Sequence, residues 1–175
     1  MMGYNMSKLC KVIATAFLVF TWTGSQVQAE EAAPTFSVKS LTPESALKVA
    51  QATLKVCRAA SFQVAVAVVD RGGAMQVMIR DRFAGPHTPE TARRKAYTAL
   101  SFRSNTTDLD EMTKAGQPAN GTRQIPNILM LGGGVMIRAG GQLVGAIGVS
   151  GAPGGQADED CAVKGLESIQ DELDF

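Results

Sequence analysis

The sequence predicts an α+β domain in which an antiparallel sheet of about five strands is flanked by helices. One helix is followed by two strands, then by helices, about three strands and a last helix, an order that favours antiparallel pairing over a parallel sheet. Two glycine pairs, Gly72-Gly73 and Gly140-Gly141, lie between valine-rich runs, where they can close hairpins. With 45% hydrophobic residues, the chain can bury a core.

The domain itself is expected over residues 41–175, after a polar, extended leader at 30–40. Its first helix is expected within Leu41–Ala60, where Thr42-Pro43-Glu44 supplies an N-cap, a proline for the first helical position and an acid for the first turn. Apolar residues then recur at helical spacing, at Leu47, Ala50, Leu54 and Cys57.

Two strands follow this helix. The near-continuous apolar run Phe62–Asp70 is rich in valine, which is typical of a central strand covered on both faces. The turn Arg71-Gly72-Gly73 leads into a second strand over Ala74–Arg82. The two strands are therefore expected to form a hairpin.

A second helix is expected over Pro89–Arg103, with Thr88 as its N-cap. Arg93, Lys95 and Tyr97 are expected to project around its outer sides. Small apolar residues form the expected inner face, so the helix can lie close to its neighbour: Ala92, Ala96, Ala99 and Leu100.

The remaining elements complete the fold. A short helix is expected over Thr107–Lys114 and, after a loop, a short strand over Ile128–Leu131. A hairpin turning at Gly140-Gly141 follows, and its second arm contains the buried strand Val144–Val149. A single closing helix is expected over Gln156–Phe175.

The first 29 residues have the pattern of a signal peptide. Two lysines precede the apolar run Val12–Trp22, and Val27 and Ala29 occupy the −3 and −1 positions of a signal-peptidase site. This apolar run is too short to span a bilayer. We expect a mature chain that begins at Glu30 and is periplasmic or secreted.

The charge balance gives no sign of a nucleic-acid partner. The chain has 17 basic and 16 acidic residues, and removal of residues 1–29 takes away two lysines and no acid, leaving a net charge of −1. There is no basic tract, and aromatic residues make up 6% of the chain. No segment after residue 29 is long and apolar enough for a membrane span.

Several kinds of site lack their residues here. One histidine and two separated cysteines do not form a structural zinc site. A serine hydrolase is hard to assemble, since no Gly-x-Ser-x-Gly elbow occurs and only one histidine is available as the base. No Cys-x-x-Cys-His motif attaches a c-type haem. Cys57 and Cys161 are both expected on helices, where they could form a disulfide after export or remain small buried thiols. The sequence leaves that pairing open.

The glycine-rich segment Gly148–Asp160 follows a strand and opens a helix, as phosphate-binding loops do. It contains no Gly-Lys-Ser/Thr, and Asp158, Glu159 and Asp160 would repel a phosphate. Acids in the first turn stabilise a helix N-terminus, which is the interpretation we favour, with a cation site as the alternative.

His87 lies beside the start of the second helix, between a glycine-proline pair and Thr88. Residue types alone leave three roles open for its imidazole. It could be a ligand to a metal or to haem iron, an acid or base, or a turn residue that donates to the backbone.

Three stretches, Val64–Gly85, Ala92–Ala99 and Gly132–Leu166, together resemble the GlcG/HbpS-like family of haem-binding domains. The family also occurs at the C-terminus of some corrinoid adenosyltransferases. The likeness extends over about Leu41 to Leu173. It implies a profilin-like antiparallel sheet between helices. It also implies a homo-oligomer that binds haem, or in some members iron or a cobalamin-type ligand, often at subunit contacts.

This resemblance implies a haem site near His87, with the imidazole as the axial ligand to iron. Cations and the nearby helix N-terminus would face the propionates, while an aromatic residue and a methionine would contact the macrocycle. The cofactor-binding residues expected on this basis are His87, Arg93, Lys95, Tyr97 and Met130, with Met136 as an alternative to Met130.

We therefore expect an exported protein that binds haem for sequestration, sensing or transport, with a corrinoid or free iron as the less favoured ligand. A sensor or transport protein is a candidate partner. Two other functions remain open. One is an accessory protein or enzyme of small organic-acid or haem metabolism, although no catalytic pair is evident. The other is an assembly module that contacts a partner protein without haem.

Overall fold

The computed structural model describes residues 33–174, so the expected signal peptide at residues 1–29 lies outside the described residues. Residues from Ser37 onward form one unit. The helices are α1 (Pro43–Ala59), α2 (Thr88–Phe102), α3 (Thr106–Met112), the 3₁₀ helix η1 (Asn120–Gln124), α4 (Gly155–Glu167) and α5 (Gln170–Leu173). The strands are β1 (Ala65–Asp70), β2 (Met75–Arg80), β3 (Gly134–Ala139) and β4 (Gln142–Ser150).

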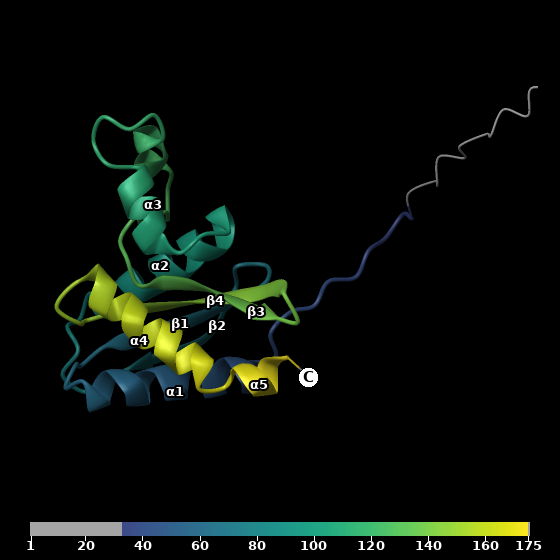
Figure 1. The fold of residues 1–175 in the computed structure, drawn as a ribbon, viewed down its shortest axis with the longest axis horizontal. Helices are drawn as coiled ribbons and strands as arrows, with labels where there is room; N and C mark the ends of the chain where they lie inside the picture. The colour runs from purple at the N-terminus through teal and green to yellow at the C-terminus, as the bar shows by residue number, and fades with distance from the viewer. Residues whose placement is uncertain (1–32, 175) are drawn as a thin grey trace, which may run out of the picture. The chain divides into compact units, whose positions relative to one another are not determined.

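These four strands form one antiparallel sheet in the order β2–β1–β4–β3 (Figure 1). The α+β class is therefore confirmed, but the expected fifth strand at residues 128–131 is not a strand. The backbone of that segment bonds to α2 instead of to a sheet neighbour. Leu129 N–H donates to Oγ1 of Thr98 at 2.9 Å, and Ile128 O accepts from Arg94 at 2.6 Å.

The sheet separates two helical layers, with α1 and α4 on one face and α2 on the other (Figure 1). On β1, Val66 and Val68 join the main core with α1 and α4, whereas Ala65 and Ala67 pack against Ala92 of α2. All of these residues are buried. The prediction of a central strand covered on both faces is therefore confirmed.

The alanine face of α2 brings this helix close to the sheet. Ala92, Ala96 and Ala99 are fully buried, as the sequence predicted. A Cβ placed on Gly148 of β4 would lie 2.0 Å from the carbonyl oxygen of Ala92, so only glycine fits beneath the helix. This close contact fixes where the N-terminal end of α2, and therefore His87, meets the end of β4.

The hairpin between β3 and β4 turns at Gly140-Gly141, as expected. Their φ angles are 54° and 76°, in the left-handed region that a two-residue hairpin turn of this hand requires. The turn therefore explains this glycine pair.

The expected single closing helix is divided into α4 and α5. Ser168 Oγ donates to the carbonyl oxygen of Gly165 at 2.8 Å, and Ile169 N–H donates to Leu166 O at 3.0 Å. These tighter bonds replace the regular helical pattern at this point, so the helix ends and restarts. None of the described helices combines the length and hydrophobicity needed to cross a bilayer.

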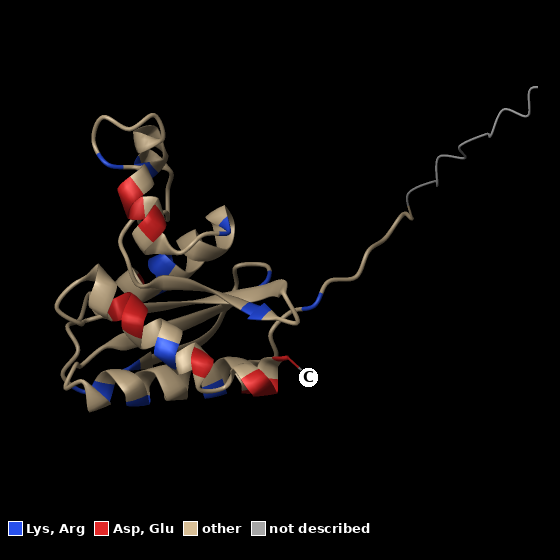
Figure 2. Ribbon diagram, viewed as in Figure 1, with Lys and Arg blue, Asp and Glu red and all other residues tan. Residues whose placement is uncertain are grey.

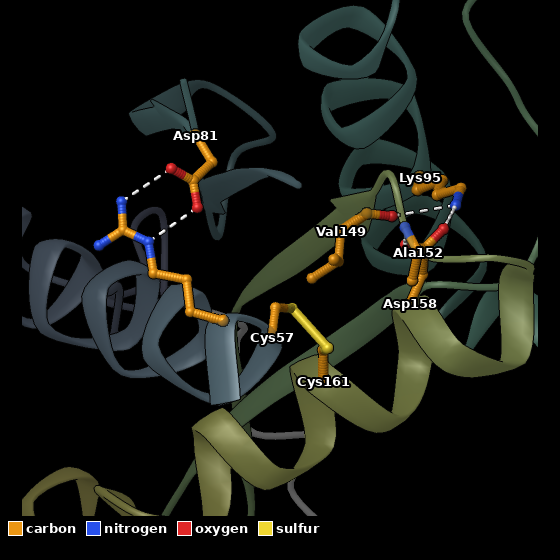
Figure 3. The surroundings of a disulfide bond; sticks show 8 residues. Cys57, Asp81, Lys95, Val149, Ala152, Asp158 and Cys161 are labelled. Carbon is orange, nitrogen blue, oxygen red and sulfur yellow. Dashed lines mark hydrogen bonds and ion pairs between the residues drawn. A yellow bond between two sulfur atoms is a disulfide. The ribbon is translucent and has the colours of Figure 1, made fainter. Parts of the chain in front are cut away.

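A disulfide joins Cys57 of α1 to Cys161 of α4 (Figure 3). Their Cα atoms lie 5.4 Å apart, within the usual range for a bridge, and both residues are buried. The pairing that the sequence left open is therefore present, and it links the two helices that cover the same face of the sheet.

Candidate functional site

A tight turn, Gly85–Thr88, precedes α2. The N–H of Thr88 and its hydroxyl both donate to Gly85 O, at 3.0 and 2.7 Å, and Thr88 is the first residue of the helix. The prediction that Thr88 is the N-cap is therefore wrong. Because Gly85 precedes the helix, the hydroxyl of Thr88 points back toward the turn and does not accept a hydrogen bond from an N–H of α2.

His87 precedes the helix, and its imidazole makes no capping hydrogen bond. The residue is exposed, and its ring lies across Gly85. A Cβ on Gly85 would lie 2.8 Å from His87 Cε1 and 3.0 Å from Nδ1. Thr88 makes the hydrogen bonds that close the turn, so the imidazole of His87 is not needed to close it.

A cavity of about 730 Å³, which we call the His87 cavity, opens beside this imidazole. Its size lies within the usual range for small-molecule and cofactor sites. Apolar side chains contribute to its wall, and Phe83 and Leu131 remain 79% and 40% exposed. The larger apolar lining residues are Phe62, Phe83, Leu129 and Leu131, and Ala152 and Pro153 also line the cavity.

The polar lining of the cavity includes Arg94 and the N-terminal end of α4 at Gly154-Gly155. The Nη2 of Arg94 donates to Ile128 O at 2.6 Å, while its buried Nε has no hydrogen-bond partner among the described residues. The first N–H groups of α4 and the helix dipole add a positive end. Both features favour an anionic group in the cavity, because the carboxylate of Asp158 on the same wall is paired with Lys95.

Sequence reasoning missed Arg94, although helical spacing could have found it. Thr91 and Arg94 follow His87 by four and seven residues, which places them on one face of α2. All three line the His87 cavity. Arg93, one position earlier, points elsewhere and pairs with Glu90 at 2.7 Å.

Lys95 also lines the cavity, but it is buried at 1% exposure, so the expectation that it projects outward is wrong. Its Nζ donates to Asp158 Oδ2 at 2.7 Å and to Val149 O at 2.9 Å (Figure 3). Burial lowers the pKa of Lys95 and raises the pKa of Asp158, because desolvation disfavours both charges and their mutual attraction only partly offsets it.

Glycines make room for this ion pair. Gly133 has a φ of 113°, and a Cβ there would lie 2.7 Å from Asp158 Cβ and 3.0 Å from Lys95 Nζ. A Cβ on Gly134 would lie 2.3 Å from Lys95 O. The glycines at the start of β3 therefore let Lys95 of α2 and Asp158 of α4 approach this end of the strand from its two sides.

Two other expected site residues lie away from the cavity lining. Met130 is 4% exposed and packs with Leu109 and Ile128, and Tyr97 lies against the same cluster. Of the five residues proposed from the sequence, His87 and Lys95 line the His87 cavity, whereas Arg93, Tyr97 and Met130 do not. Met136, the alternative methionine, does not line it either.

The acidic start of α4 has structural partners. Asp158 also accepts from Ala152 N–H at 2.9 Å, and Glu159 accepts from Thr107 Oγ1 at 2.6 Å. Between residues 33 and 174, no three His, Cys, Asp or Glu residues are grouped so that they could hold a metal ion. The sequence predicted that these acids stabilise the start of the helix, and the structure adds that Asp158 and Glu159 also bind neighbouring segments.

A family model described as "Haem degrading protein HbpS-like" matches residues 41–167. Protein GlcG of Escherichia coli K12 is 34% identical over 90 residues, covering 51% of this chain and 66% of GlcG.

Solved structures show the same fold. The crystal structure of HbpS has a TM-score of 0.73 at 36% identity, covering 79% of this chain and 96% of HbpS, a protein also crystallised from Streptomyces reticuli. The structure of a PduOC:heme complex has a TM-score of 0.69 at 25% identity and covers 74% of this chain and 95% of PduOC.

Proposed function

The chain belongs to the HbpS-like family, and from this premise we propose that it is a haem-binding protein whose ligand occupies the His87 cavity. A relative at 25% identity has been solved as a haem complex, which supports this ligand class. None of the relatives described above is named for a corrinoid or for free iron. Haem is therefore the ligand to test first.

The observation that carries the proposal is the composition of the His87 cavity. It combines the chain's only histidine with exposed apolar side chains and a positive end formed by Arg94 and α4. Haem requires a donor side chain for iron, an apolar surface for the macrocycle and cations for its propionates. These three requirements are met by residues of one cavity.

In this proposal each residue has a distinct task. The His87 imidazole would bind the iron, Phe83 and Leu131 would contact the macrocycle, and Arg94 with the α4 N-terminus would bind a propionate. Bound haem would supply a redox-active iron. Lys95 is a positioning residue, because its charge is already paired with Asp158.

Haem titration of the purified protein tests the proposal. We expect a Soret band for the wild type, and His87→Ala should shift that band and weaken binding by about tenfold or more, roughly 1.4 kcal/mol. An unaltered band and affinity in His87→Ala would place the axial ligand elsewhere, with Tyr97 or a methionine as the next candidate. Absence of binding by the wild type would overturn the proposal.

A second variant tests the position of the imidazole without removing it. Gly85→Ala places a Cβ against the ring, so it should also shift the Soret band. Gly121→Ala is the matched control, because a Cβ at Gly121 meets no atom within 4 Å. If the Soret bands of both variants match that of the wild type, haem binding does not depend on the position of the His87 ring.

Haem degradation, which the family description names, is a second candidate activity. The same sample distinguishes it from stable binding. Progressive loss of the Soret band in air after addition of a reductant such as ascorbate, with formation of open-chain products, would support degradation by dioxygen. A stable spectrum would favour sequestration, sensing or transport.

Assembly and export complete the proposed function. Phe83 and Leu131 are exposed at the mouth of the cavity, which supports a homo-oligomer in which the haem site lies at the contact with another copy. Sedimentation at micromolar concentration should then show a species larger than one chain. Export predicts that the protein from its native host begins at Glu30, and an intact mass that retains residues 1–29 would contradict it.

A further inference from the structure

A second pocket, lined by four basic side chains, lies apart from the His87 cavity. Its volume is about 380 Å³, and it shares no lining residue with that cavity. We call it the basic pocket. Its lining residues are Ser37, Val38, Lys39, Arg71, Arg103, Arg138, Gln142 and Leu143.

The four cations come from four separate parts of the chain. Lys39 precedes α1, Arg71 lies in the β1–β2 turn, Arg103 follows α2, and Arg138 belongs to β3. Figure 2 shows basic segments on the β1–β2 turn and on β3. The fold therefore brings together charges that are far apart in the sequence.

These cations have no carboxylate partner among the described residues. None of the four forms an ion pair there, and no acidic residue lines the basic pocket. Arg138 is held by Gly141 O at 3.2 Å and Met136 Sδ at 3.5 Å, both uncharged. The neighbouring carboxylate of Asp70 is used by Gly72 N–H and Ala74 N–H, at 2.8 and 3.0 Å.

The concentration of charge differs from the rest of the molecule. The whole chain has a net charge of only +1, yet four positive charges surround one hollow whose lining contains no acid. Like charges brought together repel one another, and a cleft lined by one sign of charge attracts counter-ions. The C-terminal end of α2 accounts for a cation at Arg103, but not for the other three.

We propose that the basic pocket binds a phosphate group. Guanidinium groups match phosphate oxygens in geometry and charge, and three of the four cations are arginines. A phosphate presents three acceptor oxygens in different directions, which suits donors that arrive from four chain segments, whereas a carboxylate presents two oxygens in one plane. The phosphate can belong to a soluble phosphate compound or to a lipid headgroup.

The test is titration of the purified protein with pyrophosphate at about 50 mM salt, where exposed charges are weakly screened. We expect saturable binding to the wild type that weakens at higher salt. Arg71→Gln/Arg138→Gln should weaken it by about tenfold or more, since two charge-assisted contacts are lost. The matched control is Lys55→Gln/Lys164→Gln, which removes the same charge from exposed positions outside the basic pocket and should bind like the wild type.

A second titration identifies the source of the phosphate, and a further variant checks for misfolding. In the second titration, vesicles of phosphatidylcholine with phosphatidylglycerol replace pyrophosphate. Binding in either titration supports the proposal, and the ligand that binds shows whether the phosphate belongs to a soluble compound or to a lipid headgroup. Lys39→Gln, whose side chain makes no hydrogen bond among the described residues, should weaken binding of the same ligand without unfolding the protein. Equal loss in the control pair, tighter binding of citrate than of pyrophosphate, or no binding in either titration would overturn the proposal.

Discussion

Lys95 of α2 and Asp158 of α4 form a buried ion pair that connects two walls of the His87 cavity. Their Nζ and Oδ2 atoms lie 2.7 Å apart, and both side chains are almost fully buried. The carboxylate also receives the N–H of Ala152, in the loop that leads from β4 to α4. The pair therefore holds α2, this loop and the start of α4 in one arrangement.

Loss of either partner should destabilise the fold. Lys95→Met leaves the Asp158 charge buried without its cation and should lower the free energy of unfolding by about 3–5 kcal/mol, whereas Lys95→Met/Asp158→Leu should recover part of this loss. Denaturant titration measures both variants. Lys114→Met, which breaks an exposed pair with Glu111, serves as the control and should cost no more than about 1 kcal/mol. Equal effects of Lys95→Met and Lys114→Met would contradict the prediction.

Arg94, and not Arg93, should contribute to haem affinity. Arg94→Gln should weaken haem binding by about three- to tenfold, since one charge-assisted contact to a propionate is lost, and should leave the Soret maximum in place. Arg93→Gln is the matched control because Arg93 lies outside the cavity lining and pairs with Glu90. Spectroscopic titration of both variants measures the difference. A larger loss for Arg93→Gln would instead support the residue expected from the sequence.

Asp81 should make stability depend on acid pH. Its carboxylate accepts from Arg58 Nε and Nη2 at 2.7 and 2.9 Å, and this pairing lowers the pKa of Asp81 to about 2. The unfolded chain has an Asp pKa of about 3.9. The folded state therefore binds this proton less readily, and the stabilisation present above pH 4 is lost as the pH falls toward 2.

Comparison with Asp81→Asn isolates this contribution. The stability of the wild type should fall more steeply between about pH 4 and pH 2 than that of the variant, when both are followed by denaturant titration. Glu167→Gln removes an exposed carboxylate that forms no ion pair among the described residues and does not lie in the first turn of a helix, so it should retain the wild-type profile. Parallel profiles for wild type and Asp81→Asn would show that Arg58 does not favour the ionised form.

The disulfide between Cys57 and Cys161 should contribute strongly to stability. It joins residues separated by 104 positions, so it restricts the unfolded chain considerably, and its removal should cost about 2–5 kcal/mol. In denaturant titration, Cys57→Ala/Cys161→Ala and the reduced wild type should lose similar amounts of unfolding free energy relative to the oxidised wild type. The reductant should not change the stability of the variant. Two free thiols in oxidised wild-type protein would remove the basis of this prediction.

Much of the local structure could be predicted from the sequence because it depends on neighbours in the chain. The Thr42 cap of α1 is present, with Ser45 N–H donating to Thr42 Oγ1 at 3.2 Å. The glycine pair that joins β3 to β4 adopts the expected left-handed angles. The alanine face of α2 is buried. Capping, turn geometry and helical periodicity each act within a few residues.

The Thr-Pro-Glu pattern occurs at the start of two helices but caps only one of them, because the tertiary contacts of the two threonines differ. Thr88-Pro89-Glu90 repeats the order of Thr42-Pro43-Glu44, yet Thr88 closes a turn on Gly85 and does not cap its helix. Thr88 is 1% exposed and lines the His87 cavity, whereas the start of α1 is exposed. The packing around the turn, and not the three residues, decides which acceptor the hydroxyl meets.

The sequence by itself therefore determined the family, the α+β class, most elements and the place of His87 beside the start of α2. Tertiary structure alone decided that Lys95 turns inward to Asp158 and that Cys57 pairs with Cys161. Each of these depends on contacts between segments distant in the chain, which periodicity and spacing do not encode. The buried charge of Lys95 needs an opposite charge and enough room for its ammonium group. Asp158 provides the charge, and Gly133, which has no side chain, provides the room.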